Sequence, residues 1–131
     1  MALTLDCIVL TPEKTMYEGK AEFTVLQAHD GEIGFLAGHI PLIGELGIGE
    51  MRVMYKDQIE RMIIEGGIVE VFNNKVTVLA EKVFMKKDLD VAKLQDELKK
   101  LLEADDETHS MTFKNIERQK IKTRIKVAMK N

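Results

Sequence analysis

The side chains that most often carry chemistry in proteins are scattered along this chain. None of the histidines (His29, His39 and His109) has a cysteine or acidic partner at the spacing of a metal site. Cys7 is the only cysteine, and it lies in a predicted strand with no histidine near it in sequence. A buried, inert thiol is expected there, because a reactive cysteine needs a neighbour that stabilises its thiolate. These residues predict neither a metal site nor a nucleophile.

Glycine and carboxylate clusters give no stronger sign of catalysis. Gly47-Ile48-Gly49 is the nearest approach to a phosphate loop, but no Lys-Ser/Thr pair follows it, so a turn between strands is expected. The paired carboxylates of Asp105-Asp106-Glu107 sit in a polar stretch where solvent exposure is expected. The chain is therefore predicted to be non-catalytic and to hold no cofactor.

Charge is distributed unevenly over the 131 residues. Residues 1–85 carry seven Lys/Arg against thirteen Asp/Glu, whereas residues 111–131 carry seven basic residues against Glu117 alone. Two interpretations stay open for this basic stretch: a solvated helical face, or a mobile arm that seeks an acidic surface. The N-terminus lacks a signal-peptide pattern, and no apolar run approaches the roughly 18 residues of a membrane span. Membrane association would therefore need a partner.

Residues 1–85 are predicted to form a β-sandwich of about ten short strands. Val76, Val78 and Ala80 alternate with Thr77, Leu79 and Glu81, and similar alternation occurs around residues 22–25 and 51–56. Asn73-Asn74 suits a two-residue hairpin turn, since asparagine tolerates positive φ, and Asp57-Gln58 is expected to turn the preceding hairpin. Turn signals recur about every ten residues, as in sandwiches and barrels.

Residues 86–131 are predicted to form an antiparallel two-helix hairpin. Asp88 is expected to cap the first helix, in which Val91, Leu94, Leu98 and Leu101 recur at helical spacing. Residues 104–110 read as a solvated linker, and Ser110 or Thr112 is expected to cap the second helix. Its apolar stripe is broken, because Phe113 and Ile116 fall on a different side from Ile121, Ile125 and Ala128. Such a helix has little burial to hold it in one place, so conditional docking is expected.

A glycine-rich run at residues 31–42, GEIGFLAGHIPL, predicts a shaped loop surface over residues 32–41 rather than a reaction centre. Together with GGIVEVFNNKVTVLA at residues 66–80, it resembles the epsilon subunit of the rotary F-type ATP synthase, whose patterns are close to GELGILPGHxPL and GGFLEVxxNxVTVLA. The resemblance is dense from Leu3 to about Lys93 and looser beyond. Ala37 departs from the proline usual in the family.

The resemblance implies a non-catalytic central-stalk subunit, peripheral to the cytoplasmic face of the cell membrane. Its sandwich would bind the gamma subunit and the c-ring, through Glu32, Gly38, His39 and Pro41. Glu32 would pair with a basic or amide group on the polar loops of the ring, and His39 would hydrogen-bond at the gamma contact.

The resemblance also implies that the two helices either fold against the sandwich or extend along gamma into the alpha/beta catalytic head. Extended, they would meet an acidic segment and inhibit ATP hydrolysis through basic residues, namely Lys114, Arg118, Lys120, Lys122, Arg124 and Lys126. Some bacterial relatives bind ATP in the hairpin through a motif [IL]-D-x-x-R-A near the start of the second helix. In the comparable stretch, residues 111–116, Thr112 replaces the aspartate and Asn115-Ile116 replaces Arg-Ala, so no nucleotide site is assigned.

Two rival functions follow from the residues alone. A freestanding β-sandwich module that binds a carbohydrate or peptide, with a basic helical tail, would be expected to line its groove with aromatics, but the chain has no Trp. A nucleic-acid binder would use the basic tail, which the acidic body argues against.

Overall fold

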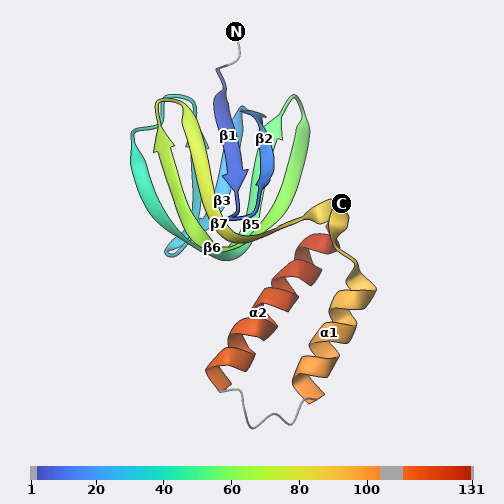
Figure 1. Cartoon of the computed structure of the whole chain (residues 1–131). Coiled ribbons are helices and arrows are strands. Elements are labelled where there is room, and N and C mark those ends of the chain that lie inside the picture. Colours follow the sequence, from blue (N-terminus) through green and yellow to red (C-terminus); the bar gives the residue numbers. More distant parts are fainter. Residues whose placement is uncertain (1–2, 104–110, 131) are drawn as a thin grey trace.

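The computed structural model describes residues 3–103 and 111–130, as a curled sheet followed by two helices (Figure 1). The strands are β1 (Leu5–Leu10), β2 (Thr15–Ala21), β3 (Phe23–Ala28), β4 (Gly31–Leu36), β5 (Leu42–Tyr55), β6 (Gln58–Phe72) and β7 (Lys75–Met85). A short 3-10 turn, η1 (Lys86–Asp88), leads to α1 (Val91–Glu103) and then α2 (Met111–Ala128).

The seven strands form one sheet in the order β2-β1-β7-β6-β5-β3-β4. The expectation of ten short strands is wrong, because β5, β6 and β7 are long and continuous, with 14, 15 and 11 residues. These three strands curve so that the sheet closes on itself in two layers (Figure 1). The first layer holds β2, β1 and the halves of the long strands that adjoin them, and the second holds β3, β4 and the remaining halves.

Glycines make the bend in the long strands. Gly66 and Gly67 have φ of 81° and 137°, in the region that favours glycine. A Cβ at Gly67 would lie 2.2 Å from the Leu79 carbonyl oxygen, so the backbones approach closely there. On β5 the pairing passes from Leu46 to Ile48, which leaves Gly47 as the irregular position. Turn signals at these glycines therefore mark bends within strands, which explains the overcount.

Two hairpin turns test the expected turn chemistry. Asn73 and Asn74 adopt φ of 49° and 59°, which confirms the turn predicted between β6 and β7. Between β5 and β6 the left-handed residues are Lys56 and Asp57, so that turn lies one residue earlier than predicted.

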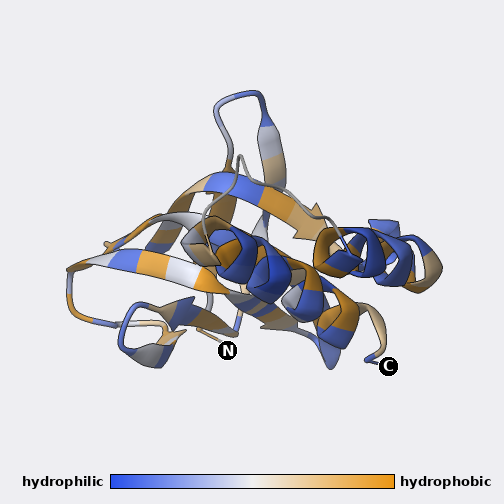
Figure 2. Ribbon diagram, turned by 90° about the horizontal axis from the view of Figure 1, so that it is seen from below, coloured by the Kyte–Doolittle hydropathy of each residue, from blue (hydrophilic) through white to orange (hydrophobic). Residues whose placement is uncertain are grey.

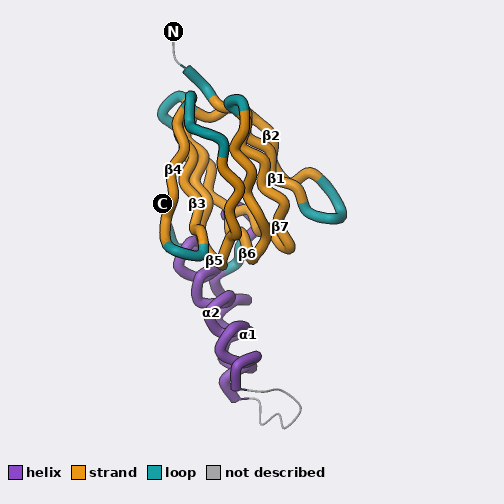
Figure 3. Tube along the Cα trace, turned by 90° about the vertical axis from the view of Figure 1, so that its left-hand side faces the viewer, coloured by secondary structure: helices purple, strands orange, loops and turns teal. Residues whose placement is uncertain are grey.

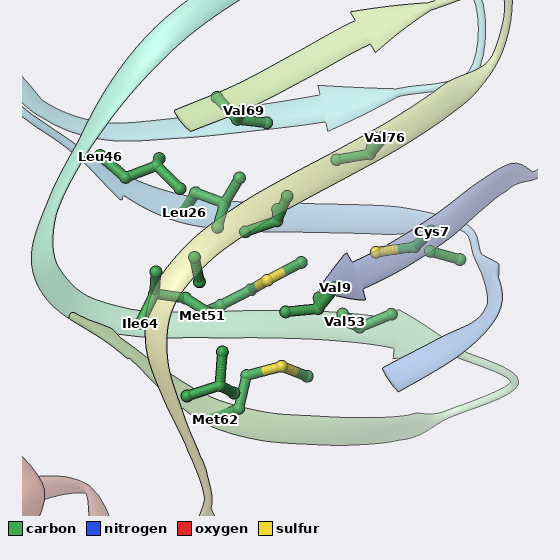
Figure 4. Packing of buried hydrophobic residues seen from close by; sticks show 14 of the residues in the cluster. Cys7, Val9, Leu26, Leu46, Met51, Val53, Met62, Ile64, Val69 and Val76 are labelled. Atoms are coloured by element: carbon green, nitrogen blue, oxygen red, sulfur yellow. The ribbon is translucent and has the colours of Figure 1, made fainter. Parts of the chain in front are cut away.

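A single apolar core fills the space between the two layers (Figure 4). It follows from strand alternation, because every second residue of β1, β6 and β7 points inward. Its members include Leu5, Cys7, Val9, Leu26, Phe35, Met51, Val53, Met62, Ile64, Val69, Val71, Val76 and Val78.

The helices leave from one end of the sandwich and run antiparallel (Figures 1 and 3). The expected cap at Asp88 is wrong: Asp88 belongs to η1, and the Asp90 carboxylate accepts the N–H groups of Ala92 at 3.0 Å and Lys93 at 3.3 Å. Thr112 is the second residue of α2 and does not cap it. The expected linker at residues 104–110, with Ser110, lies outside the described residues.

The broken apolar stripe of α2 is confirmed. Phe113 and Ile116 remain exposed, whereas Ile121 and Val127 are buried. Figure 2 shows hydrophilic residues predominating along both helices. The C-terminal part of α2 lies under the sandwich, and its N-terminal part projects away from it (Figure 3).

Candidate partner-binding surfaces

Glu32 lies in β4, not in a loop as expected, because residues 31–36 pair with β3. Its exposed carboxylate forms an ion pair with Arg52, 3.3 Å from Nη2 to Oε2. The other predicted contact residues, Gly38, His39 and Pro41, follow the far end of β4. A six-residue strand is about 20 Å long, so the structure does not bring Glu32 together with the other three.

The connection at residues 37–41 is held in a defined shape. The Gly38 N–H donates to the Asn74 side-chain oxygen at 2.7 Å, which ties this loop to the β6–β7 turn. His39 Nδ1 donates to the Ile40 carbonyl at 2.6 Å, and the imidazole meets the Phe35 ring edge-on at 4.9 Å. Since Nδ1 donates, Nε2 is the ring nitrogen left for a partner.

An exposed apolar surface continues from this loop over the first layer. It consists of Ile43, Ile68, Phe72 and Leu79, which are 74%, 44%, 60% and 47% exposed, and is called here the apolar face. Ile68 and Leu79 are direct cross-strand partners, and Leu79 in turn pairs with Leu10 of β1. Sequence reasoning missed this surface, although Leu79 stood out as an apolar residue among the outward positions of its strand. Glu70 of β6 lies among these residues, directly opposite Ile43. Exposed apolar side chains that gather on one surface mark binding surfaces.

On the second layer, α2 contacts part of the outer surface, at the end of the sandwich from which the helices leave (Figure 1). Ile63 of β6 points away from the core, since Met62 and Ile64 belong to it, yet Ile63 is 0% exposed. Beside it, Glu65 is bound by Arg124 of α2, with distances of 2.6 Å from Nε and 2.8 Å from Nη2. The guanidinium carbon of Arg124 also lies 4.2 Å from the centre of the Phe84 ring.

A second acidic group holds the end of the helix. Glu50 accepts hydrogen bonds from Lys130 at 3.1 Å, Arg52 at 3.0 Å and Arg61 at 3.1 Å. Burial opposes ionisation of Glu50, but these three donors outweigh it and hold its pKa below the usual value. Arg52 therefore lies between Glu50 and Glu32 and contacts both carboxylates.

The remaining predicted inhibitory residues lie elsewhere on α2. Arg118 contacts Asn115, and Lys120 pairs with Glu117 at 3.4 Å. Lys122 and Lys126 are exposed, have no ion pair among the described residues, and line a shallow groove with Arg118. Lys114 lies in the first turn of the helix. The structure thus divides the basic residues between a docked face and an outward face.

The described residues show no obvious reaction centre. Within residues 3–103 and 111–130, no three His, Cys, Asp or Glu side chains gather as metal ligands would. Burial raises the pKa of the Cys7 thiol to about 12, which makes it a poor nucleophile. Neither described helix has the length and hydropathy needed to cross a membrane.

The ATP-binding motif has a partial match at a place that sequence reasoning overlooked. Leu89-Asp90 followed by Lys93 fits the form [IL]-D-x-x-R-A more closely than residues 111–116, with lysine in place of arginine and Leu94 in place of alanine. The Asp90 carboxylate, however, already accepts two helix N–H groups. The structure therefore gives Asp90 a capping role.

Known proteins resemble this chain over nearly its whole length. Residues 4–86 match the family described as ATP synthase, Delta/Epsilon chain, beta-sandwich domain. The ATP synthase epsilon chain of Leptospira borgpetersenii is 36% identical over 124 residues, 95% of this chain and 94% of the relative. That of Priestia megaterium is 35% identical over 97 residues, 74% of this chain and 72% of the relative.

Two solved structures share the fold at low identity. One is the central stalk and c-ring of the Tetrahymena thermophila mitochondrial ATP synthase (TM-score 0.68, 13% identity, 95% of this chain and 96% of that chain). The other is the Euglena gracilis mitochondrial ATP synthase (TM-score 0.70, 18% identity, 93% and 75%). With the family match over residues 4–86 and relatives above 30% identity, the chain belongs to the ATP synthase epsilon chain family.

Proposed function

We propose that this chain is a non-catalytic subunit of the central stalk, which couples the rotating c-ring to the catalytic head through gamma. The observation that carries the proposal is the apolar face, which leaves Ile43, Ile68, Phe72 and Leu79 in solvent on one layer of the sandwich. A gathering of exposed apolar side chains on one surface is a mark of a binding site. In the similar Tetrahymena chain the same fold occurs in a central stalk next to a c-ring.

The two ends of β4 suggest how the contacts divide. Residues 37–41 adjoin the apolar face through the Gly38–Asn74 hydrogen bond, so we assign His39 and Pro41 to the gamma contact with that face. Glu32 lies at the other end of β4, and we assign its exposed carboxylate to the polar loops of the ring. Attachment through these partners would place the chain at the periphery of the membrane, on its cytoplasmic side.

The helical hairpin acts, in this proposal, as a brake on ATP hydrolysis. Residues 88–131, if straight and fully helical, would span roughly 65 Å, enough to reach from the sandwich into the head. The outward basic residues Arg118, Lys122 and Lys126 would meet an acidic segment there. Each exposed ion pair contributes only about 0–1 kcal/mol, but several could bias a two-state equilibrium of a few kcal/mol.

Binding to purified gamma tests the coupling role. The change of Ile68 and Leu79 together to Ser should weaken gamma binding by at least about tenfold, since each buried aliphatic side chain is worth about 1.5–3 kcal/mol. Ile59→Ser is the matched control, because Ile59 is 49% exposed on the other layer. Equal affinities for the two variants would reject the apolar face as the gamma contact.

Reconstitution with gamma and the catalytic head tests the brake. A chain ending at Met85 should raise ATP hydrolysis while gamma binding persists, which would also show that residues 1–85 fold as a domain. Unchanged hydrolysis would contradict the brake proposal. Lost gamma binding would mean that the sandwich alone does not bind gamma.

A further inference from the structure

One largely buried ion pair joins α2 to the sandwich. Arg124 binds Glu65 through both Nε and Nη2, and the two side chains are 12% and 1% exposed. Such bidentate, charge-assisted hydrogen bonds are among the strong ones in proteins. The Phe84 ring against the guanidinium fixes its plane further.

Few apolar side chains support this ion pair. The buried residues of α2 are Ile121 and Val127, and Arg124 lies between them on the same side of the helix, three residues from each. Lys130 lies beyond the last residue of α2. Beside this small apolar contact, two ion pairs join the C-terminal part of the chain to the sandwich, Arg124–Glu65 and Lys130–Glu50.

In the proposed brake, the same basic residues bind an acidic segment of another chain. Arg124 is one of the cations that the extended helix would present to acid, and in the docked state its donors Nε and Nη2 are turned toward Glu65. Lys122 and Lys126, on the outward face, stay accessible in that state. In the docked state, Arg124 is therefore occupied by Glu65, whereas Lys122 and Lys126 stay accessible to a partner.

We propose that Glu65 is an internal competitor for Arg124: it occupies the guanidinium that α2 needs to hold an acidic segment of another chain, so docking and tight binding of that segment exclude each other. Lys122 and Lys126 make the first encounter with the segment, and exchange of Arg124 from Glu65 to the segment completes the binding. The inference rests on the proposed brake for the identity of the segment, but the competition is a property of this chain alone.

Amide hydrogen exchange of the isolated full-length chain tests whether Glu65 holds the helix. Glu65→Gln keeps the side-chain shape and removes the charge, so the amides of residues 121–128 should exchange at least about fivefold faster. Glu70→Gln is the matched control, because Glu70 is an exposed residue on the uncovered layer with the same change in charge. Equal exchange in the two variants would overturn the proposal.

The specificity of the pair is tested by a double-mutant cycle. If Glu65 acts through Arg124, then Glu65→Gln combined with Arg124→Gln should loosen α2 no more than Arg124→Gln alone. Fully additive effects would mean that Glu65 holds the helix through other contacts, and the proposal would fail.

Binding of a twelve-residue poly-L-glutamate peptide at low salt tests the competition. Glu65→Gln should bind this peptide about threefold or more tightly than Glu70→Gln, and Arg124→Gln in the same chain should abolish the gain. Lys122→Gln should weaken the peptide without changing hydrogen exchange in residues 121–128. Identical peptide affinities for Glu65→Gln and Glu70→Gln would overturn the competition.

The two proposals fail in different assays. If the brake proposal is wrong, truncation at Met85 should leave ATP hydrolysis by the complex unchanged. If the competition proposal is wrong, Glu65→Gln and Glu70→Gln in the isolated chain should show the same hydrogen exchange or the same peptide affinity.

Discussion

Ile63 and Ile64 are neighbours on β6, with 0% and 3% of their surfaces exposed, yet they belong to different parts of the molecule. Ile64 points into the core shared by the two layers, whereas Ile63 is buried outside that core, on a strand that α2 contacts. The core is continuous and apolar, while the contact under α2 combines few apolar groups with two ion pairs. Similar burial of the two side chains therefore arises from two kinds of contact, a continuous apolar core for Ile64 and a mixed apolar and ionic contact on the side of Ile63.

The largest effect should separate these two isoleucines. Ile64→Ala should lower the free energy of unfolding of the sandwich by about 2–5 kcal/mol, because it leaves a cavity in a packed core. Ile63→Ala removes the same atoms but should mainly loosen α2, with a smaller loss for the sandwich. Denaturant titration, together with hydrogen exchange of β7 and α2, distinguishes the two. Equal losses in the sandwich would refute the division.

The bend in the long strands should be the next most sensitive feature. Gly67→Ala should destabilise the sandwich by at least about 2 kcal/mol, since an alanine there is strained in φ and meets the Leu79 carbonyl. Gly44→Ala, whose Cβ would meet only an ordinary contact at 3.5 Å from Val69, should change stability far less. Thermal unfolding measures both, and similar midpoints would argue against a glycine requirement at the bend.

The rate of thiol labelling at pH 8 compares how often the core and the contact under α2 open to solvent. Cys7 should react very slowly in the native chain, because it is buried and its pKa is raised to about 12. Val127→Cys in a Cys7→Ser background should react at least about tenfold faster, since it is exposed whenever α2 leaves the sheet. Leu102→Cys, at a position 56% exposed, provides the fully accessible reference. Equal protection of Cys7 and Val127→Cys would mean that the hairpin opens no more readily than the core.

The smallest effect on the attachment of α2 should come from lowering the pH. Because the pKa of Glu50 is held below its usual value, its ionised form adds stability above the unfolded pKa of about 4.3, and this is lost as the pH falls through the folded pKa. The Lys130 contact should then weaken, and α2 should loosen before the sandwich unfolds. Amide NMR shifts of α2 between pH 6 and about 3 measure this. In Glu50→Gln the part of the change that Glu50 causes should disappear.

The sequence predicted well what depends on neighbours along the chain. The alternation of Val76, Val78 and Ala80, the Asn73-Asn74 turn and the helical spacing after residue 90 are all local signals. The errors arose at glycines, which can either end a strand or bend one that continues. At Gly66-Gly67 it bends a continuous strand instead of ending it, and in β4 it sits within a strand that was expected to be a loop.

The candidate surfaces were less predictable, because they depend on which strands share a layer. Ile43, Ile68 and Leu79 lie on three different strands, and only the cross-strand register makes them one surface. Likewise, Glu65 and Arg124 are 59 residues apart, and each by itself is an ordinary charged residue. The broken stripe of α2 predicted conditional docking, which stays a prediction, and no local signal identified the carboxylates that α2 and Lys130 contact.

The three continuous strands have a mechanical consequence. Because β5, β6 and β7 pass through both layers, the two layers are joined by covalent backbone and cannot slide past each other without distorting the bend at Gly66-Gly67. A torque received on the apolar face would travel along β5 and through the hydrogen bonds of β3 to β4, which carries Glu32. We therefore expect the two layers to turn together, because the long strands stay paired with one another on both sides of the bend.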